Sequence, residues 1–161
     1  IYLDALAAHD YLTGQRGIAP EKIIAMGQSL GTAVAADLAT QRTVGGVVLE
    51  APFPSAAAVA RRVYFFLPGI TMLMRSKFDT ARKLDTIHVP VLVAHCKSDP
   101  VIAFSLGEEV FRAANEPKRF FPVEAYCHEE ISLVAPEAYA PVLREFLKSV
   151  ESDQSKVVSK L

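Results

Sequence analysis

Short apolar runs alternate with helix-forming segments along most of this 161-residue chain. The runs are rich in Val, Ile and Leu, which is typical of strands that are buried on both faces of a sheet. We predict strands at Lys22–Gly27, Val44–Pro52, Val89–Asp99 and Lys118–Cys127. Segments with helical spacing lie around them, at Ile1–Leu12, Leu30–Gln41, Ser105–Ala114 and Pro136–Val150. This alternation predicts an α/β fold, in which a mostly parallel sheet of about four strands is flanked by helices.

The composition fits one ordinary globular domain. Hydrophobic residues make up 51% of the chain, charged residues 22%, and the formal net charge is −1. A balance so close to neutral gives no long-range field to attract nucleic acid or an anionic membrane. No basic segment followed by an apolar stretch opens the chain, so we expect a cytoplasmic protein. We predict a single domain over residues 1–150 and a frayed polar tail over residues 151–161.

A glycine-flanked serine lies where the first predicted strand gives way to a helix. The sequence Gly27-Gln28-Ser29-Leu30-Gly31 has the pattern G-x-S-x-G. In this setting the serine stands on a sharp turn, and the glycines leave room for the helix to pack against the strand. The N–H of Leu30 then faces the place where an oxyanion forms. We predict Ser29 as a nucleophile and Leu30 as an oxyanion donor, against the alternative of a serine in an ordinary tight turn.

The candidate acid and base follow later strands. Asp99 comes directly after the third apolar run, and His128 follows the fourth. A carboxylate in this position fixes the tautomer of the histidine, which then takes the proton of the serine. Hydrolases with this serine pattern carry serine, acid and histidine in that chain order, and His128 is the only histidine after Asp99. We therefore predict Asp99 and His128 as triad members, with Glu50 as the rival acid.

Several segments, in the same order, resemble the α/β-hydrolase family. The stretch "GQSLG" resembles its nucleophile elbow, "VVLEAPF" the strand that follows, and "VPVLVAHCKSDPVIAFSLGEEVF" the strand and helix that carry the acid. The resemblance covers nearly the whole chain and is strongest to the esterase and acylhydrolase branch with a short helical cap. It implies a serine hydrolase that cleaves esters or thioesters through an acyl-enzyme and needs no cofactor. The alternatives are a serine peptidase with the same triad and an impaired module that only binds a ligand or partner.

The chain departs from the family pattern near the base and at its start. Cys127 precedes His128, where related sequences often carry glycine, and Glu129 and Glu130 follow it. The family also places strands, and a loop with a second oxyanion N–H, upstream of the elbow. Because the chain starts at Ile1, we expect the C-terminal two-thirds of the fold, with an open sheet edge available for association.

An insertion separates the second and third predicted strands. Residues 53–88 are too many for a plain crossover, and they include the apolar stretch Val63–Met74. We predict a cap over Ser29 with a helix from Ala56 to Phe66, which lines a pocket for the acyl group of a small ester. Shallow membrane contact is an alternative, whereas a membrane span needs about 20 apolar residues.

The remaining histidines are predicted to be non-catalytic. His9 is expected on a solvated face of the first helix, and His88 in the linker before a strand. His95 ends the third strand, where the resemblance implies a structural histidine.

The two cysteines each lie beside a histidine at the end of a predicted strand. The pairs His95-Cys96 and Cys127-His128 together contain four zinc-ligand types. Adjacent residues of a strand point to opposite faces, however, so each pair offers only one ligand comfortably. We predict no metal site and two buried thiols, with a Cys96–Cys127 disulfide as the less favoured alternative.

Overall fold

Four parallel strands form one sheet in the computed structural model, which describes residues 1–63, 78–128 and 131–158. The strands are β1 (Ile24–Gln28), β2 (Gly46–Glu50), β3 (Val91–Cys96) and β4 (Lys118–Val123). They lie side by side in chain order, and each pairs in parallel with the next. The predicted α/β fold with about four parallel strands is therefore confirmed, and the carboxyl ends of all four strands meet at one edge.

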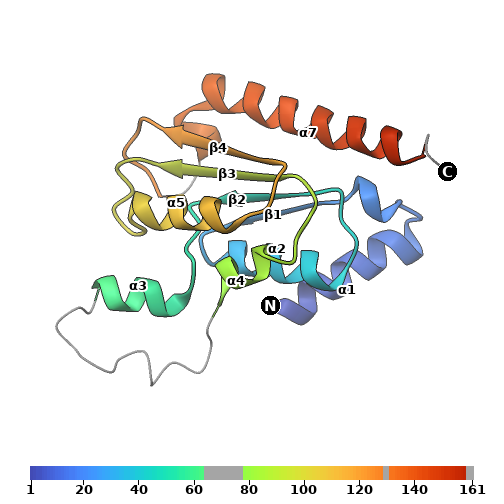
Figure 1. The fold of residues 1–161 in the computed structure, drawn as a ribbon, viewed down its shortest axis with the longest axis horizontal. Helices are drawn as coiled ribbons and strands as arrows, with labels where there is room; N and C mark the ends of the chain where they lie inside the picture. Colours follow the sequence, from blue (N-terminus) through green and yellow to red (C-terminus); the bar gives the residue numbers. More distant parts are fainter. Residues whose placement is uncertain (64–77, 129–130, 159–161) are drawn as a thin grey trace.

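Helices cover both faces of the sheet (Figure 1). They are α1 (Tyr2–Asp10), α2 (Leu30–Gln41), α3 (Ala56–Val63), α4 (Thr80–Leu84), α5 (Phe104–Ala113), α6 (Ile131–Val134) and α7 (Pro136–Val158). A π-helical turn over Tyr11–Gln15 follows α1. The short helices α4 and α6 were not predicted. The last helix continues past Val150 to Val158, so the predicted frayed tail is helical over most of its length.

Two apolar layers hold the helices to the sheet. Side chains of β3 alternate between them: Val91 and Val93 face the layer shared with α2, α4 and α5, whereas Leu92 and Ala94 face α7. In Figure 1, α7 lies along one side of the sheet, and α1, α2 and α4 lie along the other. This alternation fixes which side chains at the strand ends can reach each other.

The first helix corrects one prediction. His9 is 4% exposed, and its Nε2 lies 2.9 Å from the carbonyl oxygen of Thr43. We expected a solvated face here, which is wrong because α1 packs against α2 and covers that side of the helix. A histidine accepts such a position when one ring nitrogen finds a polar partner.

Only part of the predicted cap lies within the described residues. The helix α3 begins at Ala56, and the hydroxyl oxygen of Ser55 accepts a hydrogen bond from the N–H of Ala58 at 3.2 Å. Residues 64–77, which hold most of the predicted apolar cap, lie outside the described residues, as do Glu129 and Glu130. Of the helices in the described ranges, none combines the length and the apolar character that a membrane span requires.

Candidate active site

Ser29 stands on the turn between β1 and α2. Its backbone has φ 49° and ψ −118°, in the left-handed half of conformational space that residues with a Cβ rarely adopt. The N–H of Ser29 donates to the carbonyl of Glu50 at 2.8 Å, and its own carbonyl accepts from the N–H and the hydroxyl of Thr32. A strained residue costs about 1–3 kcal/mol and persists only where its surroundings hold it in place, as these bonds do here.

The two glycines of the motif have different roles. A Cβ added to Gly27 would overlap the backbone carbonyl of Gly31, so the close approach of β1 and α2 requires glycine at this position. A Cβ added to Gly31 would meet nothing within 4 Å, outside its own helical turn, in the described part of the chain. The expectation that both glycines make room for packing therefore holds for Gly27 alone.

Leu30 is the first residue of α2. The first N–H groups of a helix have no acceptor within the helix, and the helix dipole adds a partial positive charge at this end. The backbone N–H of Leu30 thus lies directly after the serine, at the position predicted for an oxyanion donor.

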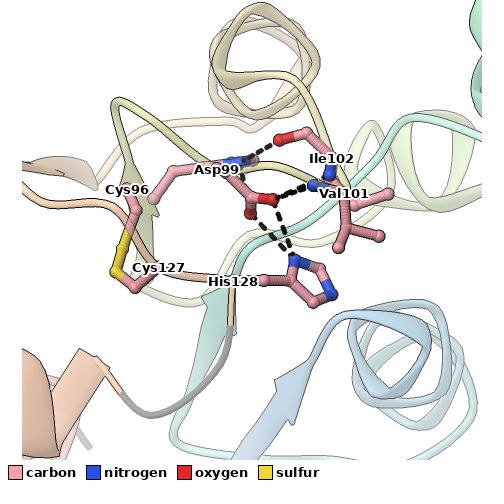
Figure 2. Close-up of a disulfide and its surroundings, with 7 residues drawn as sticks. Cys96, Asp99, Val101, Ile102, Cys127 and His128 are labelled. Atoms are coloured by element: carbon pink, nitrogen blue, oxygen red, sulfur yellow. Dashed lines mark hydrogen bonds and ion pairs between the residues drawn. A yellow bond between two sulfur atoms is a disulfide. The ribbon is translucent and has the colours of Figure 1, made fainter.

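Asp99 occupies the loop after β3, and its side chain is fully buried. Its Oδ1 accepts hydrogen bonds from the backbone N–H groups of Val101 and Ile102, each at 2.8 Å. Both carboxylate oxygens face Nδ1 of His128, at 3.1 Å for Oδ1 and 2.9 Å for Oδ2 (Figure 2). The two backbone donors fix the carboxylate in the orientation that meets the imidazole.

His128 joins the acid to the serine. Its Nε2 lies 3.0 Å from the hydroxyl oxygen of Ser29, and its side chain is 13% exposed. With its proton on Nδ1, facing Asp99, the ring leaves Nε2 free to accept the hydroxyl proton of Ser29. The structure therefore brings together the serine, the acid and the histidine that we predicted, although they are far apart in the chain.

A second histidine, His95, contacts both Asp99 and the turn that binds it. His95, fully buried at the end of β3, has its Nε2 2.9 Å from the carbonyl oxygen of Ile102 and 3.3 Å from Oδ2 of Asp99. Burial lowers the pKa of His95, which favours the neutral ring with its proton on Nε2, donated to Ile102. His95 thus holds the turn whose N–H groups bind Asp99. The sequence indicated a structural histidine but not the residue that it supports.

Glu50, the rival acid, lies on the other side of the sheet. Its carboxylate accepts a hydrogen bond from the hydroxyl of Tyr139 in α7 at 2.6 Å. Burial raises the pKa of Glu50, and the bond from Tyr139 opposes that shift. The described contact between Glu50 and the triad is a backbone one, in which the carbonyl of Glu50 accepts the N–H of Ser29. The carboxylate that contacts His128 is that of Asp99.

The cysteines are joined, which overturns the prediction of two buried thiols. Cys96 and Cys127 form a disulfide with a Cα–Cα distance of 5.7 Å, within the range that a bridge allows. The prediction failed because the chain after β4 turns back onto the end of β3, which strand positions alone do not reveal. Sulfur atoms in a disulfide are not thiolate ligands, and His95 faces α5 while Cys96 faces α7. No cluster of three or more potential metal ligands occurs among the described residues.

Comparisons with known proteins identify relatives of the chain. No family model matches the chain. An uncharacterized protein of Mycobacterium tuberculosis is 36% identical over 144 residues, which cover 89% of this chain and 51% of that protein. The human alpha/beta hydrolase domain-containing protein 17C is 32% identical over 151 residues, covering 91% of this chain and 43% of that protein. The chain thus spans about half the length of the curated relatives it matches.

The fold is also that of solved esterases. The structure of a Pyrococcus furiosus esterase superposes with a TM-score of 0.73 at 19% identity, over 93% of this chain and 61% of the esterase. At this level of identity the likeness shows the fold alone. Sequence and structure therefore identify the chain as a relative of the alpha/beta hydrolase domain-containing proteins, with the α/β-hydrolase fold.

Proposed function

We propose that the chain carries the catalytic triad of a serine hydrolase that cleaves carboxylic esters or thioesters. One observation carries the proposal: Nε2 of His128 lies 3.0 Å from Oγ of Ser29 while Nδ1 lies 2.9 Å from Asp99. A histidine held between a carboxylate and a strained serine is the arrangement that activates a hydroxyl for nucleophilic attack.

The proposed reaction has two halves. Oγ of Ser29 attacks the acyl carbonyl as Nε2 of His128 takes its proton, and the backbone N–H of Leu30 donates to the oxyanion. His128 then gives the proton to the leaving alcohol or thiol, which departs and leaves an acyl-enzyme. Water, deprotonated by His128, releases the acid and restores Ser29, while Asp99 stabilises the imidazolium in both halves.

Labelling by a fluorophosphonate probe tests this proposal directly. The probe phosphonylates an activated serine, so the wild-type protein should be labelled at Ser29 and Ser29→Ala should not be labelled. Ser105, exposed on α5, provides the matched control, because Ser105→Ala should label like the wild type. Hydrolysis of p-nitrophenyl butyrate should follow the same pattern. Labelling that persists in Ser29→Ala would remove the serine from the proposed mechanism.

The same assay separates an ester from an amide substrate. A serine peptidase with this triad would also cleave the p-nitroanilide of the same acyl group, whereas the proposed esterase should cleave only the p-nitrophenyl ester at an appreciable rate. A protein that is labelled at Ser29 but prefers the anilide would transfer the proposal to the peptidase alternative.

A further inference from the structure

The Cys96–Cys127 disulfide lies beside both the acid and the base of the site. Cys96 is the last residue of β3, and Asp99 follows it three residues later in the chain. Cys127 lies in the loop after β4, and His128 is the next residue. Figure 2 shows the bridge between the two loops, next to the pair formed by Asp99 and His128. The covalent link therefore joins the two chain segments whose separation sets the Asp99–His128 distance.

Within the described residues, backbone bonds connect the same two loops only at their beginning. The N–H of Lys97 donates to Val123 at 2.8 Å, and the N–H of Ser98 donates to Ala125 at 3.3 Å. For residues 126–128, the described part of the chain offers no backbone bond of this kind to the loop of Asp99. Among the described residues, the disulfide is therefore the covalent or backbone link that joins residues 126–128 to the loop of Asp99.

The bridge also joins two residues that are offset from the register of the sheet. In the sheet, Cys96 is in register with Val123, yet it is bonded to Cys127, four residues further along. The segment after β4 thus leaves the sheet edge and returns to it. Tyr126, within this segment, is 76% exposed, whereas Cys127 is buried against the layer under α7. The bridge thus holds the segment that contains His128 close to the loop that contains Asp99.

We propose that Cys96 and Cys127 are positioning residues for the hydrolysis, because their disulfide holds the imidazole of His128 against Asp99. This inference rests on the proposed function. A displacement of about 1 Å at a reacting group can reduce a rate by about 100-fold, so a loosened loop costs turnover without removing any triad residue. The effect falls on kcat more than on KM, because His128 moves protons in the transition state and does not hold the acyl group.

Opening the bridge has a defined chemistry. A thiolate of a dithiol such as dithiothreitol attacks one sulfur and forms a mixed disulfide, and the second thiolate of the reagent resolves it. The first attack releases one cysteine as a thiolate and the second attack releases the other, so the dithiol supplies the two electrons, and Cys96 and Cys127 each take up a proton. The dithiol leaves as its cyclic disulfide. Because both cysteines are buried, reduction has to be verified by counting thiols rather than assumed.

The test compares the oxidised and reduced forms of one protein. The chain is purified without reductant, its thiols are counted, and p-nitrophenyl butyrate hydrolysis is measured before reduction, after reduction and after reoxidation. We expect no free thiol at first and two after reduction. We also expect kcat to fall by about tenfold or more with little change in KM, and to recover on reoxidation. Circular dichroism at each stage shows whether the fold is retained.

A double variant provides the matched control. Cys96→Ala/Cys127→Ala should show the lower kcat of the reduced protein and should not respond to the dithiol. If this variant fails to fold, the reduction experiment on the wild-type protein decides alone. Two thiols in the protein purified without reductant, or a reduced folded protein with kcat within about twofold of the oxidised one, would overturn the inference.

A readout that does not require catalysis separates this inference from the proposed function. Proton NMR detects the imidazole N–H that His128 donates to Asp99, and this signal should broaden or disappear on reduction. A signal that responds to reduction in a protein with no hydrolase activity would contradict the proposed function but support the positioning role. Full hydrolase activity with a signal that does not change on reduction would support the proposed function but contradict the positioning role.

Discussion

The two halves of the candidate site are built in different ways. The half that holds Ser29 is local: a strand, a sharp turn and a helix, with Gly27 removing the one side chain that would obstruct them. The half that holds Asp99 and His128 is assembled by contacts between segments far apart in the chain. The buried His95 and a disulfide stabilise this second half. One half therefore depends on backbone sterics and the other on tertiary contacts.

This difference teaches where each half is vulnerable. The elbow depends on the missing side chain of Gly27 and on the hydrogen bonds that hold Ser29, of which one reaches the neighbouring strand at Glu50. The acid and base loops depend on the residues that hold them together, namely His95 and the Cys96–Cys127 disulfide. The predictions below test each half separately.

The largest effect is expected at Asp99, in the half built by tertiary contacts. Asp99→Asn should lower kcat by about 10⁴-fold, because an amide favours the wrong tautomer of His128. Glu50→Gln, the matched control on the opposite side of the sheet, should lower kcat far less. Steady-state hydrolysis of p-nitrophenyl butyrate measures both. If the two variants rank in the reverse order, Glu50 is the acid.

Gly27→Ala should produce the largest effect in the local half. The added Cβ would overlap the backbone carbonyl of Gly31, which has no flexible end to move away. We expect the free energy of unfolding to fall by about 3 kcal/mol or more, together with a loss of fluorophosphonate labelling. Gly14→Ala is the control, since a Cβ there meets nothing within 4 Å. Chemical denaturation measures both variants, and equal stability would show that the elbow is not built by close packing.

Gly107→Ala tests the support behind the acid. Gly107 lies in α5, and a Cβ there would overlap Nδ1 of His95, whose ring would have to move away from Ile102. We expect a loss of about 1–3 kcal/mol in the free energy of unfolding and a fall in kcat smaller than that of Asp99→Asn. Glu109→Ala, at an exposed position on the same helix, is the control. An unchanged kcat in a destabilised protein would mean that His95 supports the fold but not the acid.

The smallest effect is the pH dependence that His95 contributes to stability. Because its pKa is lowered from 6.5 in the folded protein, the unfolded chain binds more protons just below that pH. Stability from this group is therefore lost as the pH falls below about 6.5, by at most about 1.4 kcal/mol per pH unit. Glu50, with a raised pKa, contributes in the opposite direction and loses stability as the pH rises above 4.5.

Unfolding free energies at about pH 7.5 and pH 5.5, compared between the wild type and a His95 variant, separate the contribution of His95 from that of Glu50. His95→Gln keeps an N–H donor near Ile102 but does not titrate, so its stability should change less between the two pH values than that of the wild type. His88→Gln, at an exposed position, should behave as the wild type does. Equal pH dependence in all three proteins would contradict a buried neutral His95.

The sequence predicted the fold and the local half of the site more completely than the other half. Periodicity identified the four strands, and the elbow motif specified a turn, because both depend on neighbouring residues. Chain order selected Asp99 and His128, which the structure brings together. The support behind them was not predicted, because the close approach of Gly107 to His95 and the return of Cys127 to Cys96 depend on how distant segments pack. The solvated face expected for His9 failed for the same reason.

The separation of the proposed triad along the chain links its assembly to the late stages of folding. Ser29 and His128 are 99 residues apart, and the sheet strands between them pair in sequential order. Contacts over such distances form late, because the entropy of closing the intervening chain must be overcome first. A chain that is still being synthesised can form the elbow early, but it has no base within reach until β4 joins the sheet. The proposed nucleophile is thus kept apart from its proposed base until the chain up to His128 has been synthesised and packed.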